Sequence, residues 1–152
     1  MALPTGMSSC AMCVRLMTGT AWVDYSDNLS VVEPPSWDRD TAKANVFGET
    51  APLTVTGKHN PVDVTIRGIW AAGTTDAFYV VYAQYTTACS GLVAVQWAPE
   101  GCATTSDAFS TNTTKSTVSS LVFPGGDSGS ADVLMWECTI HSPDITRGTY
   151  AA

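Results

Sequence analysis

The stretch VDVTIR, residues 62–67, decides the fold class because its apolar and polar residues alternate without a break. Side chains on a β-strand point alternately to its two faces, so this pattern predicts a strand with one buried face and one solvated face. Gly68 then interrupts the alternation before Ile69 and Trp70, as a β-bulge would.

A second alternating stretch, ADVLMWECTI at residues 131–140, predicts the longest strand. One face carries only apolar residues: Leu134, Trp136, Cys138 and Ile140. The opposite face is half apolar: Val133, Met135, Glu137 and Thr139. Because a free monomer normally keeps the solvent face of a strand polar, we expect both faces of this strand to be contacted.

One short helix is expected between the two alternating stretches. Gly73–Asp76 supplies a cap with an acidic residue at the positive end of the helix dipole. An apolar stripe follows at helical spacing, formed by Phe78, Val81, Tyr82 and Tyr85. The helix should end near Thr87–Gly91.

The rest of the chain alternates between short apolar segments and segments rich in turn residues. We expect further strands at residues 20–25, 29–32, 53–56, 92–97 and 117–123, with a brief strand at 45–47. Residues 1–19 are expected to form an N-terminal arm, residues 34–52 a long loop, and residues 99–114 a polar loop. Strands, one helix, then more strands, joined by turns, predict a single mainly β (α+β) domain over residues 1–152, an antiparallel β-sandwich or half-barrel with one short α-helix.

The composition favours a chain that is covered by partners. Charged residues make up only 14% of the sequence, against ~25% in typical soluble domains. The net charge of −7 argues against tight nucleic-acid binding and against docking on anionic membranes. No run of ~18 apolar residues is present, so no membrane-spanning helix is expected. No secretory signal is expected either, because the one basic residue near the N-terminus, Arg15, lies within or after the short apolar stretch.

The five cysteines are expected to be reduced, because an odd number in a domain of this size is typical of a cytoplasm-like compartment. Cys10 and Cys13 form a C-x-x-C pair, but a zinc site would need two further ligands, and the two histidines, His59 and His141, are isolated. We expect neither a metal nor any cofactor.

The sequence contains no catalytic motif in the context that its chemistry requires. Gly126–Gly129 reads GDSG, as around the nucleophile of trypsin-like proteases, but it lies between two predicted strands and favours a hairpin turn. The pairs Asp24/Asp27 and Asp38/Asp40 lie in or beside loop sequence with no pattern of a cleft. The sequence therefore predicts a structural protein rather than an enzyme.

From about Leu53 to the C-terminus, the order of segments resembles the major tail (tail tube) proteins of siphophages. The resemblance rests on LTVTGKHNPVDVTIRGIW, on the helix containing DAFYVVYAQY, on a strand ending in Trp97-Ala98-Pro99, on STVSSLVFP, and on the closing ADVLMWECTIHSPDITRGTYA. It covers roughly two-thirds of the chain, and residues 1–50 contribute little.

The resemblance implies a virion protein, assembled in the host cytoplasm, that forms stacked homohexameric rings around a channel. It implies a tape-measure protein, tail terminator and distal tail proteins as partners, and transient, non-specific passage of DNA. Six copies at −7 would give about −42 per ring, which would keep nucleic acid from adhering to the wall. A net charge of −7 is also ordinary for solubility.

Candidate contact residues follow from these expectations. Residues at the start of the long loop and on the half-apolar strand face are candidates for contacts between subunits or rings: Trp37, Asp38, Arg39, Asp40, Val133 and Met135. Asp63 and Glu137 are candidates for the channel lumen. The alternatives are another virion β-domain, such as a decoration or tail-completion protein, and an extracellular carbohydrate-binding β-sandwich module that uses some of the five tryptophans.

Overall fold

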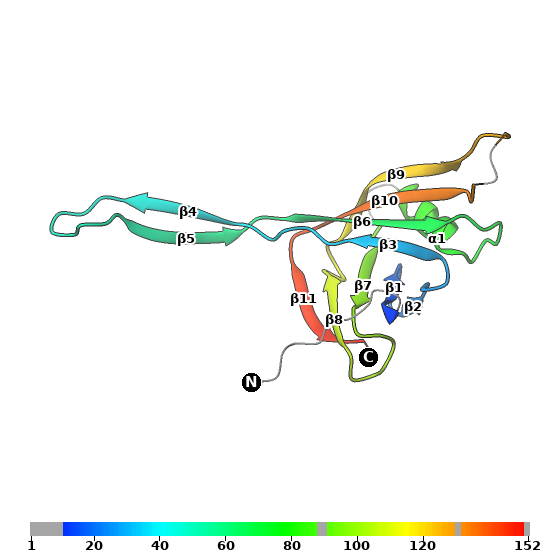
Figure 1. Cartoon of the computed structure of the whole chain (residues 1–152), viewed down its shortest axis with the longest axis horizontal. Coiled ribbons are helices and arrows are strands. Elements are labelled where there is room, and N and C mark those ends of the chain that lie inside the picture. Colours follow the sequence, from blue (N-terminus) through cyan, green and yellow to red (C-terminus); the bar gives the residue numbers. More distant parts are fainter. Residues whose placement is uncertain (1–10, 88–90, 130–131, 151–152) are drawn as a thin grey trace.

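A computed structural model describes residues 11–87, 91–129 and 132–150. Within them the chain forms two sheets that pack together, one short helix, and a separate two-stranded hairpin that extends far from the rest (Figure 1). All strand pairs are antiparallel, which confirms the expected mainly β, antiparallel fold with one short helix.

The four-stranded sheet contains both alternating stretches. Its order is β3 (Leu29–Glu33), β6 (Val62–Ile69), β10 (Met135–Ser142) and β9 (Thr117–Gly125). Thr65 lies opposite Thr139, and this register places most apolar residues of β6 and β10 on one face: Val62, Val64, Ile66, Trp136, Cys138 and Ile140. Val64, Ile66 and Ile140 on that face are fully buried, as their alternation predicts.

The five-stranded sheet has the order β11 (Ile145–Thr149), β8 (Asp107–Thr111), β7 (Ala94–Ala98), β1 (Cys13–Met17) and β2 (Trp22–Asp24). Val14, Leu16, Val95 and Trp97 of this sheet meet the buried face of the four-stranded sheet in one core. The helix α1 (Ala77–Tyr85) adds Phe78 and Val81 to that core. Its other two stripe residues, Tyr82 and Tyr85, remain exposed.

The second face of the five-stranded sheet buries a cation. Arg15 donates a hydrogen bond from Nε to Gln96 Oε1 at 2.9 Å, and its guanidinium lies 4.0 Å from the ring centre of Tyr150. The Tyr150 hydroxyl donates to Asp24 at 2.9 Å. Burial, together with this hydrogen bond, raises the pKa of Tyr150 to about 12, so the phenol stays protonated and Arg15 keeps an uncharged aromatic cover.

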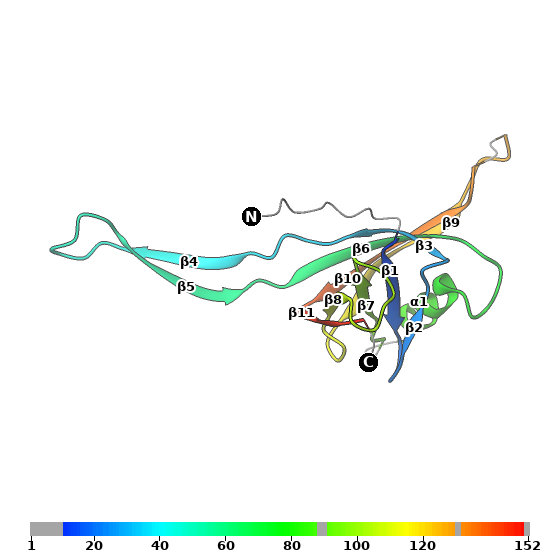
Figure 2. The same ribbon diagram turned by 60° about the horizontal axis from the view of Figure 1, so that its bottom comes forward.

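The hairpin arm consists of β4 (Arg39–Ala44) and β5 (Leu53–His59), which pair only with each other. Figures 1 and 2 show the arm extending from one end of the four-stranded sheet, while the end of β9 and the start of β10 lie toward the opposite end. The chain passes from β3 through residues 34–38 into β4, and it returns from β5 through Asn60 and Pro61 into β6. The arm therefore continues the ribbon that β3 and β6 form in the sheet.

Several sequence-based expectations are wrong in detail. Residues 13–17 of the expected N-terminal arm form a strand in the middle of the five-stranded sheet. Residues 39–44 of the expected loop 34–52 form β4, whereas residues 45–47 form no strand. The expected loop at 99–114 contains β8, whose residues Ala108 and Thr111 are buried.

The bulge expected at Gly68 also needs correction. Gly68 lies inside an unbroken β6, and the irregular register falls between Leu29 and Val31 of β3. Glycine is required at position 68 because a Cβ on that residue would lie 2.8 Å from the Asn28 carbonyl oxygen and 2.9 Å from the Trp136 ring.

The cysteines are not all reduced. Cys13 and Cys102 form a disulfide, which ties β1 to the segment that precedes β8. Cys138 is a free thiol in the core, and burial raises its pKa to about 12. Cys10 and Cys89 lie outside the described residues, so the C-x-x-C pair stays a sequence observation.

Candidate assembly interface

The outer face of the four-stranded sheet, which points away from the core, carries a polar belt. Its members alternate with the core residues along β3, β6 and β10: Glu33, Asp63, Thr65, Arg67, Glu137, Thr139 and His141. Both candidate lumen residues, Asp63 and Glu137, belong to this belt.

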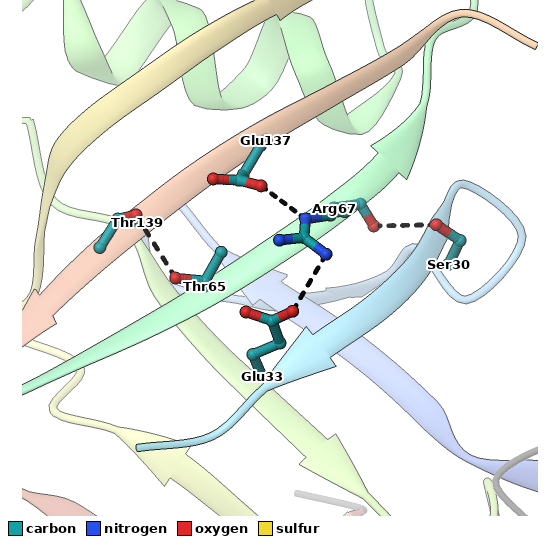
Figure 3. Close-up of polar contacts among 6 residues, drawn as sticks. All are labelled: Ser30, Glu33, Thr65, Arg67, Glu137 and Thr139. Carbon is teal, nitrogen blue, oxygen red and sulfur yellow. Dashed lines mark hydrogen bonds and ion pairs between the residues drawn. The ribbon is translucent and has the colours of Figure 1, made fainter.

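Arg67 occupies the centre of the belt and links three strands (Figure 3). Its guanidinium bonds Glu137 of β10 through Nε and Glu33 of β3 through Nη1, the latter at 3.0 Å. The hydrogen bond to Glu137 and the nearby charge of Glu33 raise the pKa of Arg67, so it remains a cation at any physiological pH. Beside it, the hydroxyls of Thr65 and Thr139 lie 3.5 Å apart.

A second ion pair lies nearer the arm. His141 Nδ1 is 2.7 Å from an oxygen of Asp63, with both side chains about half exposed. The acidic residues of the belt therefore stand beside cationic or ionisable partners. The belt carries three carboxylates, Arg67 and His141, so its net charge is −2 with an uncharged imidazole.

The opposite end of the outer face is apolar. Ile69 and Met135 lie directly opposite each other, and Val122 pairs with Glu137 one step along the sheet. All three apolar side chains are exposed, as is Val133 in the segment before β10. Cross-strand neighbours on one face form a shared surface, so the candidate contact residues Met135 and Val133 lie in or beside an exposed apolar patch.

The edges of the four-stranded sheet are β3 and β9. Sheet edges offer backbone hydrogen-bonding groups to any further strand. Since each neighbouring pair is antiparallel, four strands leave β3 and β9 running in opposite directions. The two edges therefore match: a β3 placed beside the β9 of another copy would continue the antiparallel alternation.

The remaining candidate contact residues lie together at the base of the arm. The Trp37 ring stacks on His59 with centroids 4.3 Å apart, and Arg39 Nη2 lies 2.7 Å from His59 Nε2. The Asn60 backbone N–H donates to the Asp38 carbonyl at 2.9 Å, and the Asn60 side chain donates to Asp40 at 3.1 Å. These contacts hold the two strands of the arm together where it leaves the sheet.

The arm itself has two unlike faces. Ala42 lies opposite Val55, and Ala44 opposite Leu53, which gives one face only apolar side chains. The other face presents threonines and a lysine: Thr41, Lys43, Thr54 and Thr56. Leu53 and Val55 are each 55% exposed, so the apolar face of the arm is uncovered in the single chain.

Neither a cluster of metal ligands nor a membrane-spanning helix is found among the described residues. They contain no group of three or more His, Cys, Asp or Glu placed to hold a metal ion. In the same part of the chain, no helix combines the length and apolarity needed to cross a bilayer.

Comparisons with known proteins give a structural answer only. No protein-family model and no curated protein matches the sequence. A chain in the cryo-EM structure of the tube-terminating cap of the anti-feeding prophage matches with a TM-score of 0.73 at 14% identity, covering 98% of this chain and 95% of that one. A chain in the sheath/tube terminator structure of an extracellular contractile injection system, PVC, matches with a TM-score of 0.73 at 14% identity, covering 97% and 100%.

A third neighbour comes from a different particle. A chain in the virion of a native gene transfer agent matches with a TM-score of 0.64 at 8% identity, covering 95% of this chain and 100% of that one. At these identities the likeness establishes a shared fold, which extends over nearly the whole length of each chain.

Sequence reasoning found the acidic members of the belt but missed their partners. Arg67 stood in the stretch that decided the fold, yet its position between Glu33 and Glu137 depends on the register of three strands. The apolar face of the arm had a visible signal, since Leu53 and Val55 alternate with Thr54 and Thr56. The matching residues of β4, Ala42 and Ala44, are too small to reveal it.

Proposed function

We propose that this chain is a structural subunit of a phage-like tail tube, which forms hexameric rings that stack around a channel. The observation that carries the proposal is the matched pair of open edges on the four-stranded sheet, together with an arm whose apolar face its own chain leaves uncovered. The resemblance to siphophage tail tube proteins supports it, as does the fold shared with chains of contractile injection systems and a gene transfer agent.

Ring closure follows from the strand directions. An even number of alternating strands per copy lets β9 of one subunit pair with β3 of the next without reversing the pattern. Such head-to-tail contacts generate closed rings when the rotation per subunit closes. Closure also removes both exposed edges, which would otherwise promote uncontrolled aggregation.

The polar belt would then line the channel. In a barrel built from these sheets, the core face packs on the five-stranded sheet, so the outer face points to the lumen. A wall that carries paired charges and a small negative excess offers no cluster of free cations to hold phosphate. This suits the passage of nucleic acid past a tape-measure protein, and Asp63 and Glu137 would then face the lumen.

The arm would join successive rings. It leaves one end of the sheet and extends far beyond the body (Figure 2), which suits contact with a subunit of the next ring. Burial of its apolar face there would supply the energy of stacking at roughly 25 cal/mol per Å². Trp37, Asp38, Arg39 and Asp40 then set the direction in which the arm leaves the ring.

Electron microscopy and light scattering of the purified protein test this proposal. We expect rings and tubes from the native chain, and single rings from a variant with Leu53→Asp and Val55→Asp on the apolar face of the arm. Thr54→Asp places the same charge on the opposite face of β5 and serves as the matched control, which should still form tubes. A native protein that stays monomeric at high concentration would refute the proposal.

A second position in the same particle is favoured by the neighbours, since two of them come from a tube-terminating cap and a sheath/tube terminator. A terminator subunit would form rings that stop after one layer even with an intact arm. The length of the assemblies formed by the native chain alone therefore separates the two roles.

A further inference from the structure

A shallow hollow lies between the end of α1 and the start of β9. Its volume is about 270 Å³, and its lining includes Tyr85, Leu92, Thr117 and Val118. This is below the ~300–1,000 Å³ of typical small-molecule pockets. A hollow of this size suits a single large side chain better than a free ligand.

The surroundings of the hollow are apolar and exposed. Tyr85 and Leu92 of its lining are exposed, and farther along the same flank Tyr82 of α1 contacts Phe123 of β9 with ring centroids 5.9 Å apart. Phe123 and Tyr82 are also exposed. Contiguous exposed apolar surface of this kind marks sites where another protein binds.

The hollow adjoins the edge that the proposed ring uses. Leu92 forms a bridge to Thr117 at the start of β9, and the Val93 N–H donates to the Ser116 carbonyl at 3.1 Å. These contacts occupy the first residues of the β9 edge, so an incoming strand can pair only with the part beyond them. Whatever continues from that strand passes over Leu92.

The direction of the incoming strand identifies the segment that would lie over Leu92. A β3 that pairs antiparallel with β9 has its C-terminal end, Glu33, toward the start of β9. The next residues are Pro34-Pro35-Ser36-Trp37. The prolines have no N–H to donate and favour an extended course, so the chain leaves the ladder there and brings Trp37 toward the hollow.

We infer that the hollow between α1 and β9 receives Trp37 of the neighbouring subunit in the ring. The inference rests on the proposed ring and specifies its lateral contact. Trp37 is 42% exposed in the single subunit, where its ring lies against that of His59. Tryptophan in a pocket is a preferred anchor of protein interfaces because it buries a large area with few rotatable bonds.

A photo-crosslinking amino acid, p-benzoylphenylalanine, placed at position 37 tests the contact in the full-length protein. We expect crosslinks between subunits to peptides containing residues 84–92 or 117–118, in the assembled fraction only. The same group at Val46, near the tip of the arm, is the control and should label a different region. Rings that form normally but crosslink from position 37 to other regions would overturn the inference and leave the proposed function standing.

Two substitutions measure the strength of the contact. Trp37→Ala should raise the protein concentration needed for half-maximal ring formation by at least about tenfold, as for an interface anchor, and Trp37→Phe should restore part of the loss. Leu92→Arg should have the same effect as Trp37→Ala while the circular dichroism spectrum stays native. If Leu92→Arg fails to fold, the crosslinks of the otherwise native chain decide. Unchanged assembly of Trp37→Ala would refute the inference, and a native chain that forms no rings would refute both proposals.

Discussion

One ribbon of the chain has two halves with opposite surroundings. In the half made of β3 and β6, Val64 and Ile66 are fully buried against a second sheet. In the half made of β4 and β5, Leu53 and Val55 alternate in the same way but are each 55% exposed. The same pattern of sequence therefore serves two purposes, and the difference lies in what covers the apolar face.

The comparison shows that the body buries its apolar strand residues within the chain, whereas the arm leaves its own exposed. An isolated two-stranded hairpin is at best marginally stable in water. The contacts at the base of the arm are the hydrogen bonds of His59 and Asn60 and the contact between the rings of Trp37 and His59. Because β4 and β5 form a sheet of their own, we expect the body to fold independently of the arm.

The largest expected effect comes from the same substitution made in both halves. Ile66→Asp places a carboxylate at a fully buried position and should abolish folding, because an unpaired buried charge costs several kcal/mol. Val55→Asp should change the free energy of unfolding of the monomer by less than about 0.5 kcal/mol, as for an exposed site. Urea unfolding followed by circular dichroism at low protein concentration measures both. Similar losses in the two variants would mean that the arm folds as part of the body.

The disulfide sharpens the comparison, because it stabilises the body alone. Cys102→Ser opens a crosslink between residues 89 positions apart and should lower the free energy of unfolding by about 2–4 kcal/mol. Under non-reducing conditions, mass spectrometry of a digest should recover the two cysteine peptides joined. Cys138 should resist alkylation until the protein unfolds, since its thiol is buried. A native chain with Cys13 freely alkylated would contradict this pairing.

A pair of glycines gives the smallest effect. Gly68→Ala should destabilise the protein by about 1–3 kcal/mol, because the added methyl group would meet a backbone oxygen at 2.8 Å and a packed indole at 2.9 Å. Gly57→Ala in the arm meets the Asp40 carbonyl oxygen at 3.2 Å, and the uncovered hairpin can shift by the few tenths of an ångström required. Thermal unfolding of the two variants side by side should show a lower midpoint for Gly68→Ala only.

The elements that the sequence predicted are those with one buried face and one solvent-exposed face. Alternation in residues 62–67 identified the buried face of β6, and the segment before Ala77 identified the helix. Alternation also identified the buried face of β10, but that strand begins at Met135, half-buried Leu134 lies before it, and β9 with 9 residues is longer than β10 with 8. The sequence did not predict β1, because residues 13–16 are all buried. Arg15 therefore interrupts an apolar run and does not mark a solvent-exposed face. β4 was not predicted for the opposite reason, since all of its residues are exposed and it has no buried face to predict.

The candidate site was predictable to the same extent. Face assignments within one strand placed Asp63, Glu137 and Met135 on the outer side of the sheet. Contacts between strands were beyond reach, because the link from Glu33 through Arg67 to Glu137 joins three strands from distant parts of the sequence. The disulfide was missed for the same reason, as nothing near Cys13 or Cys102 records that their strands are neighbours.

The order of strands in the four-stranded sheet also indicates the order in which its strand contacts form during folding. β6 has its second neighbour, β10, far along the chain: Thr65 and Thr139, which lie opposite each other, are 74 residues apart. Contacts this distant in sequence form late, because a long loop must close first. Until β10 pairs with it, β6 is paired with β3 alone, so the four-stranded sheet is completed late in folding.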